Sequence, residues 1–527
     1  MFWVDEIVED IIKKIPKDSY LVTDWMTTSG HAHVGSLRGV IVHDLVRRGL
    51  VENGKIAEFQ WGFDDFDPMD GLPSYLDESW LQYMGKPLCN IPAPDGIHET
   101  FAKQYGDEFE EVLSYLGIKP KIVFTSKLYK EGVFNDSIKI ILDSATEIRK
   151  IYLEISGSNK GDDWYPFQVI CPKCGKIGTT KVTGWDGKEV EFTCEENLVS
   201  WAKGCGHKGK ISPFDGNGKL PWKVEWPSKW HVTKTDIEGE GKDHFAAGGS
   251  RDIADKIYRE IFKKTPPYDI RYEHILIGGA KMSSSKGLGV TAKDMADFLP
   301  GNILRFLFVR TRFKRAIDFQ PEGETIPLLY DEFDRAQMAL TEDPKLDLSR
   351  ASHYTEIDQK KDPSTMLRAG QPKYLLRFSK IAYMLQMPRV DVFEYAKLEK
   401  GEALTEVEKQ EIENRIIVAK RWLEKFAPEN YKFTIQEKLP EEAKKISAQQ
   451  KEFLKKIFGA IKTKGFSGED LHKEIHNIKN EMKIVPRDAF SSIYLTFLGK
   501  DSGPQAGWLL ASLDKEFVLE RLEEAQE

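Results

Sequence analysis

Apolar and polar positions follow two different patterns along the chain, and the change lies near residue 300. Before it, short apolar runs alternate with amphipathic stretches. The runs predict strands at 20–23, 56–63, 121–125 and 272–277, and the stretches predict helices over 36–51, 135–152 and 252–263. Such alternation is typical of a parallel sheet covered by helices on both faces. We therefore predict a Rossmann-type, doubly wound α/β domain over residues 1–310.

After residue 300 the strand signals fade and helical periodicity dominates. It predicts helices over 302–309, 372–385, 405–425, 441–463, 469–482 and 487–497. We expect an all-α domain over 361–527, joined to the first domain by a linker or stem-contact region at 311–360. The segment 310–320, RTRFKRAIDFQ, is basic and aromatic, which suits contact with an RNA backbone. Its alternative role is that of a solvated linker.

The charge balance narrows the classes of partner. The chain has 527 residues, enough for about three or four domains, and its net charge is −8. This balance argues against a protein that coats DNA, but a local basic face still allows tRNA binding. No apolar run reaches the length of a membrane span, and residues 1–19 predict an amphipathic helix instead of a signal peptide. We expect a cytoplasmic protein with no DNA or membrane partner.

Four of the five cysteines fall in one short stretch, where a polar segment predicts two strands around a Trp-Asp-Gly turn. A C-x2-C knuckle with a second cysteine pair beyond such a hairpin is typical of tetrahedral zinc. The predicted ligands of a structural zinc ion are Cys171, Cys174, Cys194 and Cys205. His207 is the rival of Cys205 as fourth ligand, and the zinc-ribbon insertion spans about 160–235. Cys89 stands apart and is predicted to be a small buried hydrophobe.

A possible second metal patch is the group Asp95, His98 and Glu99, which offers oxygen and imidazole ligands. The favoured alternative is a helix start that carries acidic residues.

Two Gly- and Ser-rich turns carry the strongest chemical signal, and each follows a predicted strand. The first is HAHVGS at His31–Ser36, and the second is KMSSSKG at Lys281–Gly287. A strand–turn–helix junction directs backbone N–H groups and a positive helix end at an anion. His33 can donate to phosphate oxygens, Gly35 lets adenine lie on bare backbone, and the two lysines of the second turn can neutralise a triphosphate. Two such turns far apart in sequence make chemical sense if both close on one nucleotide.

The order S-G-x-x-H-V-G-S then K-M-S-S-S-K-G resembles the HIGH and KMSKS signatures of class I aminoacyl-tRNA synthetases. More of the chain resembles the class I lysyl-tRNA synthetase family, through GKDHFAAGGSRD at 241–252, CPKCG at 171–175, GCGHKG at 204–209 and TFLGKDSGPQAGWLL at 496–510. Two positions depart from the signatures. Ser36 stands where the first ends in His, and Ser284 replaces the second Lys of the other, so that Lys286 is expected to supply that charge.

This resemblance implies a ligase that activates lysine with ATP and transfers it to tRNA(Lys), with Mg²⁺ held mainly by the triphosphate. It implies catalytic roles for His33, Lys281 and Lys286. The expected ATP contacts are Gly30, His31, His33, Gly35, Ser36, Asp243, His244, Lys281 and Ser284. The expected amino-acid contacts are Thr27, Ser29, Trp222, His244 and Tyr272.

Lysine specificity requires a carboxylate for the ammonium group and a slot for the methylenes. Asp24 or Asp44 could supply the charge. The spaced tryptophans Trp222, Trp226 and Trp230 either line the slot or pack in the core.

By the same resemblance the helical tail reads the anticodon, whose unpaired bases offer stacking faces and hydrogen-bonding edges. The stretch Phe497–Trp508 supplies Lys500, Gln505 and Trp508 for such contacts, or is a simple interhelical turn.

Three other functions compete with this one. The first is a class I synthetase for another amino acid, such as glutamate. A tRNA-independent nucleotidylyltransferase is the second, but it predicts a single compact domain, and the long helical tail argues against it. A zinc-ribbon RNA-binding protein without enzymatic activity leaves the first 150 residues unexplained. Pyrophosphate exchange with lysine, ATP and tRNA separates them.

Overall fold

The computed structural model describes residues 1–277, 280–281, 291–357, 374–465 and 467–526. It divides into two compact units. The first comprises Met1–Phe319 with Glu342–Arg368, and the second comprises Gln320–Thr341 with Ala369–Glu527. This division is one of compactness, so the functional division at 310 and 360 stays a prediction. Among the described residues, no helix is both long and apolar enough to cross a membrane.

A five-stranded parallel sheet forms the centre of the first unit. Its strands are β1 (Ser19–Met26), β2 (Ile56–Phe63), β3 (Lys121–Phe124), β9 (Ile237–Gly241) and β10 (Tyr268–Tyr272). They lie in the order β10-β9-β1-β2-β3, and every neighbouring pair is parallel. The chain leaves β1 toward β2 on one side and comes back to β9 on the other. Ligands bind at the carboxyl ends of the strands flanking such a switch point. The predicted fold class is confirmed.

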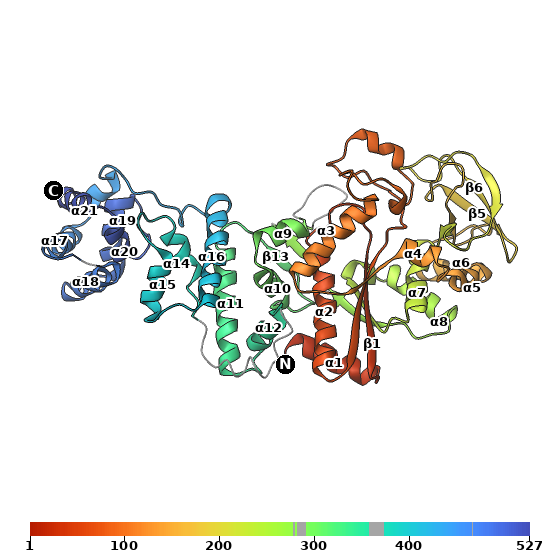
Figure 1. Ribbon diagram of the computed structural model, residues 1–527, viewed down its shortest axis with the longest axis horizontal. Coiled ribbons are helices and arrows are strands. Elements are labelled where there is room, and N and C mark those ends of the chain that lie inside the picture. The colour runs from red at the N-terminus through yellow and green to blue at the C-terminus, as the bar shows by residue number, and fades with distance from the viewer. Residues whose placement is uncertain (278–279, 282–290, 358–373, 466, 527) are drawn as a thin grey trace. The chain divides into compact units, whose positions relative to one another are not determined.

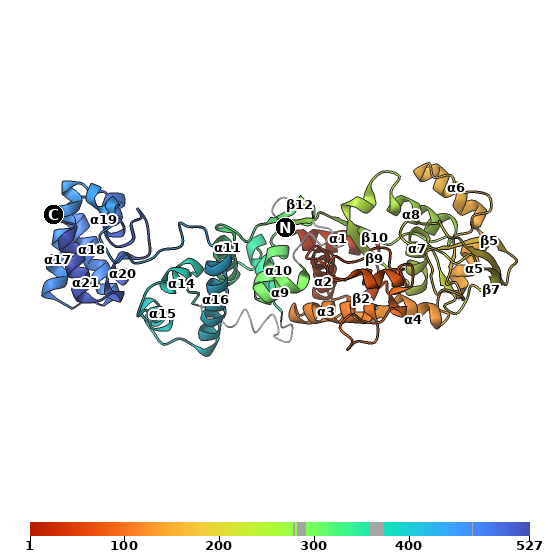
Figure 2. The ribbon, with the colours of Figure 1, turned by 90° about the horizontal axis from the view of Figure 1, so that it is seen from above.

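Helices surround this sheet, as the two ribbon views show (Figure 1 and Figure 2). Those of the first unit are α1 (Trp3–Lys14), α2 (Ser36–Glu52), α3 (Phe101–Tyr115), α4 (Thr125–Lys130), α5 (Asn135–Asp143), α6 (Ala145–Ser156), α7 (Trp222–Thr233), α8 (Ser250–Glu260), α9 (Ala292–Phe298), α10 (Gly301–Val309) and α12 (Asp347–Thr355). Helix α2 packs against β1, β2 and β9, so its N-terminus lies beside the switch point. Short 3₁₀ turns are η1 (Glu78–Tyr83), η2 (Leu88–Asn90) and η3 (Lys242–Phe245).

Two predicted elements of this unit are wrong in their extent. The helix predicted over 135–152 is two helices, because the chain leaves helical geometry at Ser144, where φ is −101° and ψ is 18°. Asp and Ser both favour such breaks by competing for backbone hydrogen bonds. The strand predicted over 272–277 is also two strands. Strand β10 ends at Tyr272, and β11 (Ile275–Ile277) joins a separate sheet with β12 (Ala280–Lys281) and β13 (Ile317–Phe319).

The cysteine-rich insertion forms two small antiparallel sheets. One pairs β4 (Gln168–Val169) with β8 (Gly218–Lys219), and the other contains β5 (Thr180–Trp185), β6 (Val190–Cys194) and β7 (Lys208–Ile211). Figure 1 shows β5 and β6 beside α5 and α6. Val182, Val190 and Phe192 are buried in one apolar cluster with residues of those helices. The ribbon is therefore anchored on the core of the first unit.

The second unit is helical, as predicted. It contains most of α11 (Thr325–Glu342), then α14 (Phe378–Met384), α15 (Val392–Lys400), α16 (Glu406–Lys425), η5 (Glu441–Lys445), α17 (Ala448–Thr463), α18 (Gly468–Glu481), α19 (Pro486–Leu498), α20 (Ala506–Ser512) and α21 (Lys515–Glu524). The helix predicted over 441–463 is wrong at its start, because Ser447 and Gln450 form a capping box that begins α17. The helix predicted over 372–385 begins only at Phe378.

Candidate active site

A cavity of about 360 Å³ lies at the carboxyl ends of β1, β9 and β10. Its wall is formed by Asp24, Trp25, Met26, Thr27, His33, Gly35, Ser36, Arg38, Trp61, Glu240, Gly241, Asp243, His244, Tyr272, His274 and Ile275. The topology explains the position, because β1 and β9 are adjacent parallel strands whose crossovers run in opposite directions. Residues separated by more than 200 positions are thereby brought into one wall.

His33 lies in the turn between β1 and α2, and its tautomer follows from its hydrogen bonding. The backbone N–H of Gly35 donates to Nδ1 of His33 across 2.9 Å. A neutral imidazole that accepts at Nδ1 carries its proton at Nε2, so His33 is a donor at Nε2. A Cβ added at Gly35 would lie 2.3 Å from Cε1 of His33. The position of the histidine ring therefore requires glycine here, and the expected contact of Gly35 with adenine stays a prediction.

Helix α2 begins at Ser36, which lies in the cavity wall. The first-turn amides of Ser36, Leu37 and Arg38 already donate to His33, Val34 and Gly35. These three amides are therefore not available to an anion in the cavity. The positive end of the 17-residue helix and the Nε2–H of His33 would attract it instead.

Gly30 and His31 lie outside the cavity wall, although the sequence analysis expected both to contact ATP. His31 Nδ1 is 2.8 Å from Glu108 Oε2, and its ring packs on Tyr75 and Tyr105. Gly30 has a φ of +148°, which favours glycine, and a Cβ there would be 2.6 Å from the Tyr75 hydroxyl. Their arrangement holds the turn in place, and their ATP contacts stay predictions.

Described residues on both sides of the second signature motif lie at or near this cavity. Ile275 lies in the cavity wall, five residues before the strand pair that contains Lys281. After the motif, the backbone N–H of Ala292 donates to the carbonyl of Ala32 across 2.7 Å, and Thr291 forms an antiparallel β-bridge with His33. The side chain of Lys281 and residues Ser284 and Lys286 lie outside the described residues. Their roles stay predictions.

Two carboxylates, Asp24 and Glu240, give the cavity an acidic side. Asp24 Oδ2 is 3.2 Å from His43 Nδ1. The backbone N–H of Gly239 donates to Nε2 of His43 across 2.7 Å, so the proton of a neutral imidazole is at Nδ1, where the carbonyl of Gly39 accepts it across 2.7 Å beside Asp24. Burial, together with the nearby Asp24 and Glu238, raises the pKa of Glu240 well above its usual value. A cation entering this side would satisfy both acids.

Asp44, the other acid considered for this role, lies elsewhere. It is buried between Arg48 and Arg305, at 2.8 Å and 2.9 Å. These contacts are structural, so of the two acids the structure places Asp24 in the cavity wall.

The expected amino-acid contacts are only partly brought together. Thr27, His244 and Tyr272 lie in the wall, whereas Ser29 is exposed outside it. Trp222 lies outside the wall as well, with its ring 5.4 Å from that of His244.

The other two tryptophans of this set belong to the core. The indole nitrogens of Trp226 and Trp230 donate to the buried carboxylate of Glu238. The core-packing alternative therefore holds for these two.

Asp243 lies just after the C-terminal end of β9, where its Oδ1 is 3.1 Å from His274 Nε2. The sequence analysis missed His274, Glu240 and Arg38. Glu240 directly precedes Gly241, the first residue of the quoted motif GKDHFAAGGSRD, and this position was an available signal. No signal in the sequence marked Arg38. Its side chain is 1% exposed and donates to the carbonyls of Phe308 and Arg312. Burial lowers the pKa of its guanidinium to about 10.

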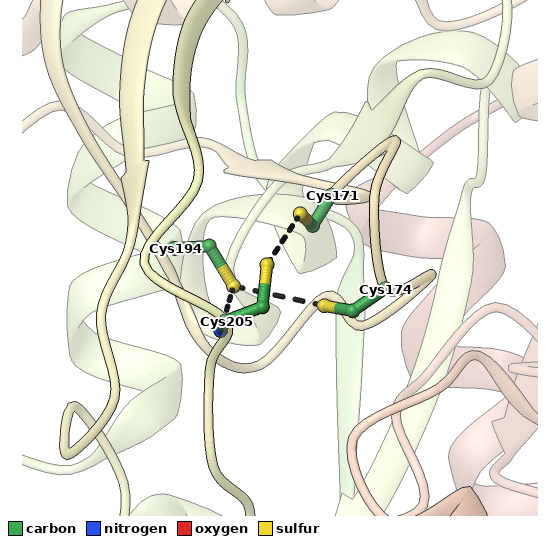
Figure 3. A group of neighbouring side chains, drawn as sticks. All are labelled: Cys171, Cys174, Cys194 and Cys205. Carbon is green, nitrogen blue, oxygen red and sulfur yellow. Dashed lines mark hydrogen bonds between the residues drawn. The ribbon is translucent and has the colours of Figure 1, made fainter.

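The four clustered cysteines converge on one point, as Figure 3 shows. The potential ligand atoms of Cys171, Cys174, Cys194 and Cys205 all lie within 4.8 Å of one another. The Sγ atoms of Cys171 and Cys205 are 3.6 Å apart, and those of Cys174 and Cys194 are 3.7 Å apart. Four thiolates about 2.3 Å from a tetrahedral zinc ion would have sulfurs about 3.8 Å apart. The geometry therefore fits a zinc ion.

His207 plays a different part in this loop. Its ring packs edge-on against Phe192, and its carbonyl accepts the N–H of Cys194 across 2.8 Å. Cys89 is half-buried, and burial raises the pKa of its thiol to about 12, so it behaves as an un-ionised hydrophobe.

The possible second metal patch forms a turn. Asp95 accepts from the backbone N–H and from Nδ1 of His98, at 3.1 Å and 2.6 Å, and His98 Nε2 is 3.6 Å from Asp107. Thr100 then caps α3. In the part of the chain that the structure describes, the four cysteines are the one close group of three or more possible ligands. Asp95, His98 and Glu99 therefore do not form a ligand set.

In the second unit, the residues expected to read bases have partners within the fold. Lys500 donates to the carbonyls of Glu429 and Lys432, both at 2.7 Å. Gln505 accepts from the Tyr395 hydroxyl across 2.9 Å. The Trp508 ring lies 4.5 Å from that of Tyr395. This arrangement favours the interhelical-turn alternative for these side chains.

Comparisons with known proteins agree with this architecture. Residues 1–361 match the family of tRNA synthetases class I (K), and residues 399–526 match an anticodon binding domain. The lysine–tRNA ligase of Methanosarcina barkeri strain Fusaro is 37% identical over 551 residues, covering 99% of this chain and 97% of its own. That of Archaeoglobus fulgidus is 32% identical over 526 residues, covering 100% of both chains. The chain therefore belongs to the class I (K) tRNA synthetases.

Proposed function

We propose that this chain is a lysine–tRNA ligase, which activates lysine with ATP and transfers it to tRNA(Lys). The similarity to lysine–tRNA ligases along 97% or more of both chains carries the proposal. The parallel-sheet cavity, with an anion-binding side at α2 and an acidic side at Asp24 and Glu240, supports it. The anticodon binding domain at 399–526 accounts for the helical unit.

The first step requires positioning and charge stabilisation more than a protein nucleophile. A carboxylate oxygen of lysine forms a bond to the α-phosphorus of ATP, and the bond to pyrophosphate breaks. His33 would donate from Nε2 to the phosphate oxygens as their charge increases, and the positive end of α2 would act in the same direction. By family resemblance, Lys281, Ser284 and Lys286 complete the triphosphate contacts, and Mg²⁺ accompanies the ATP.

The same resemblance gives Gly30, His31, Gly35, Ser36, Asp243 and His244 the remaining contacts to ATP. For the amino acid it gives Thr27, Ser29, Trp222, His244 and Tyr272.

The acidic side of the cavity favours lysine over glutamate. Asp24 and Glu240 can accept hydrogen bonds from an ammonium group, whereas a glutamate side chain would bring a further carboxyl group beside these two acids. Like charges in a partly desolvated site disfavour the wrong substrate. We therefore assign the lysine ammonium to this side.

A zinc ion at the cysteine cluster would be structural, because four thiolates fill a tetrahedral shell and leave no position for water. When bound, the ion would cross-link two loops of the insertion. The proposed partners are tRNA(Lys), ATP and lysine, and the proposed location is the cytoplasm.

Pyrophosphate exchange tests the proposal. The full chain is incubated with ATP, labelled pyrophosphate and tRNA, and with lysine or glutamate. Label should enter ATP with lysine only. Exchange with glutamate and not lysine would assign the chain to another amino acid, and exchange with neither would overturn the proposal.

A further inference from the structure

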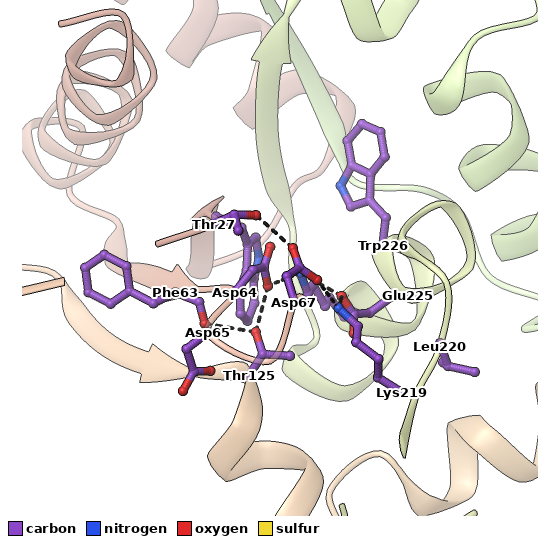
Figure 4. Close-up of polar contacts among 12 residues, drawn as sticks. Thr27, Phe63, Asp64, Asp65, Asp67, Thr125, Lys219, Leu220, Glu225 and Trp226 are labelled. Carbon is purple, nitrogen blue, oxygen red and sulfur yellow. Dashed lines mark hydrogen bonds and ion pairs between the residues drawn. The ribbon is translucent and has the colours of Figure 1, made fainter. Parts of the chain in front are cut away.

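A cluster of charged side chains, most of them buried, contacts Thr27 of the cavity wall through Asp67, and Figure 4 shows this contact. We call it the Lys219 cluster, and it consists of Asp64, Asp67, Lys219, Glu225 and Lys229. Lys219 and Lys229 are each 2% exposed, and Glu225 is fully buried. Burying ions is costly unless they are paired and hydrogen-bonded, so a buried cluster of this size requires a structural or functional reason.

Asp67 joins this cluster to the cavity. Lys219 Nζ forms an ion pair with Oδ1 of Asp67 and lies 3.2 Å from Oε2 of Glu225. The other oxygen of Asp67, Oδ2, accepts the hydroxyl of Thr27 across 2.8 Å. The two oxygens of Asp67 thus have different partners, and the ammonium group fixes which one faces Thr27.

This arrangement decides what Thr27 offers to a ligand. A hydroxyl has one proton and two acceptor lone pairs. Because the proton of Thr27 is directed at Asp67, its oxygen presents lone pairs to the cavity that it lines. An acceptor polarised by a carboxylate suits an ammonium group, and the substrate has one on its α-carbon.

Lys219 comes from the insertion and not from the sheet. It is in β8, where it pairs with Gln168 of β4, and Ile170 donates to the carbonyl of Asn217 across 2.9 Å. Cys171, the first residue of the cysteine cluster, follows Ile170 directly. The chain that holds the cysteines therefore also places an ammonium group behind the amino-acid side of the cavity.

We propose that Lys219 is a positioning residue of the amino-acid subsite: it holds Asp67 so that Thr27 accepts a hydrogen bond from the α-ammonium group of the substrate. This inference rests on the proposed function. It adds a role for the insertion, which sets amino-acid affinity from outside the cavity.

A double-mutant cycle on the full chain tests it, with the dissociation constants of lysine and of ATP measured by calorimetry. Lys219→Met and Thr27→Val should each weaken lysine binding roughly tenfold. Thr27→Val removes the acceptor, and Lys219→Met removes the ammonium group that holds Asp67 toward Thr27. ATP binding should stay within about twofold in both. In the Thr27→Val background, Lys219→Met should change lysine binding less than about twofold, since its effect passes through Thr27.

Additive losses in the cycle, or unchanged lysine binding in Lys219→Met, would overturn the inference. If Lys219→Met does not fold, Asp67→Asn replaces it in the same cycle, because it also removes the ion pair. The matched control is Arg415→Met, which removes a fully buried cation paired with Asp334 in the second unit. It should leave lysine binding unchanged, and a loss there equal to that of Lys219→Met would show a general folding effect instead. Absence of lysine binding in the unmodified chain would contradict the proposed function itself.

Discussion

The amide of Gly35 and Nδ1 of His33 are joined by a hydrogen bond of 2.9 Å, which fixes the only proton of a neutral His33 ring at Nε2. The relationship is local, since a single residue separates the two, yet it decides the chemistry of the phosphate side of the cavity. A donor of fixed orientation stabilises developing charge without reorganising during the reaction.

His33→Ala should lower the rate of lysine activation by roughly 10²-fold or more, because it removes the Nε2–H donor. His33→Gln should recover part of the rate, because the amide nitrogen of Gln can reach a similar position. Single-turnover adenylate formation measures both. Near-normal turnover of a folded His33→Ala protein would count against the assignment of this cavity.

Gly35→Ala should disturb the same step without changing any reactive group. The new methyl group would lie 2.3 Å from Cε1 of His33 and would force the ring from its position. We expect a loss of activation of about 10-fold or more with unchanged lysine binding, because the phosphate side alone is affected. As a control, Gly54→Ala adds a methyl group in open space, although its positive φ of 74° costs some stability.

Cys174→Ser should abolish stoichiometric zinc binding, because three thiolates and a hydroxyl hold zinc less well than four thiolates. Metal analysis of the purified protein measures this directly. Cys89→Ser is the matched control and should keep one zinc ion per chain, since Cys89 is not in the cluster. Should His207→Ala lose the metal while Cys205→Ser keeps it, the fourth ligand would be the histidine.

The ion pair of His31 and Glu108 should contribute more to the stability of the first unit at low pH than at high pH. The hydrogen bond to Glu108 raises the pKa of His31 above its usual value of 6.5. This contribution is therefore fully present below about pH 6.5 and is lost as the pH rises through the raised pKa. Urea unfolding of the unmodified chain and of Glu108→Gln should differ most near pH 5.5 and least near pH 8.5. A difference that grows with pH would contradict the pairing.

Trp508→Ala should destabilise the helical unit by about 3 kcal/mol, because the ring packs against Tyr395 and covers Gly468. Thermal unfolding measures this loss. If instead stability is unchanged while tRNA(Lys) charging falls, Trp508 contacts the tRNA, as the sequence analysis first expected.

Local patterns were sufficient wherever neighbouring residues decide the outcome. Strand β2 and helix α2 were predicted within a residue, because apolar periodicity and a Gly–Ser turn act over one element. The cysteine spacing predicted the cluster of four, because a knuckle and a hairpin bring their own ligands together. The break at Ser144, which separates α5 from α6, was not predicted, because one non-helical residue hardly changes the apolar periodicity.

By itself, the sequence determined the fold class, the family resemblance, the two signature turns and the cluster of four cysteines, all of which rest on short-range spacing. Only the tertiary structure decided that Asp24 faces the cavity while Asp44 pairs with arginines, that His31 packs beside Glu108, and that Lys219 reaches Thr27 through Asp67. The physical reason is that charge pairing and hydrogen bonding depend on which strands become neighbours. Strand order in a doubly wound sheet joins residues some 200 positions apart, and no local pattern records it.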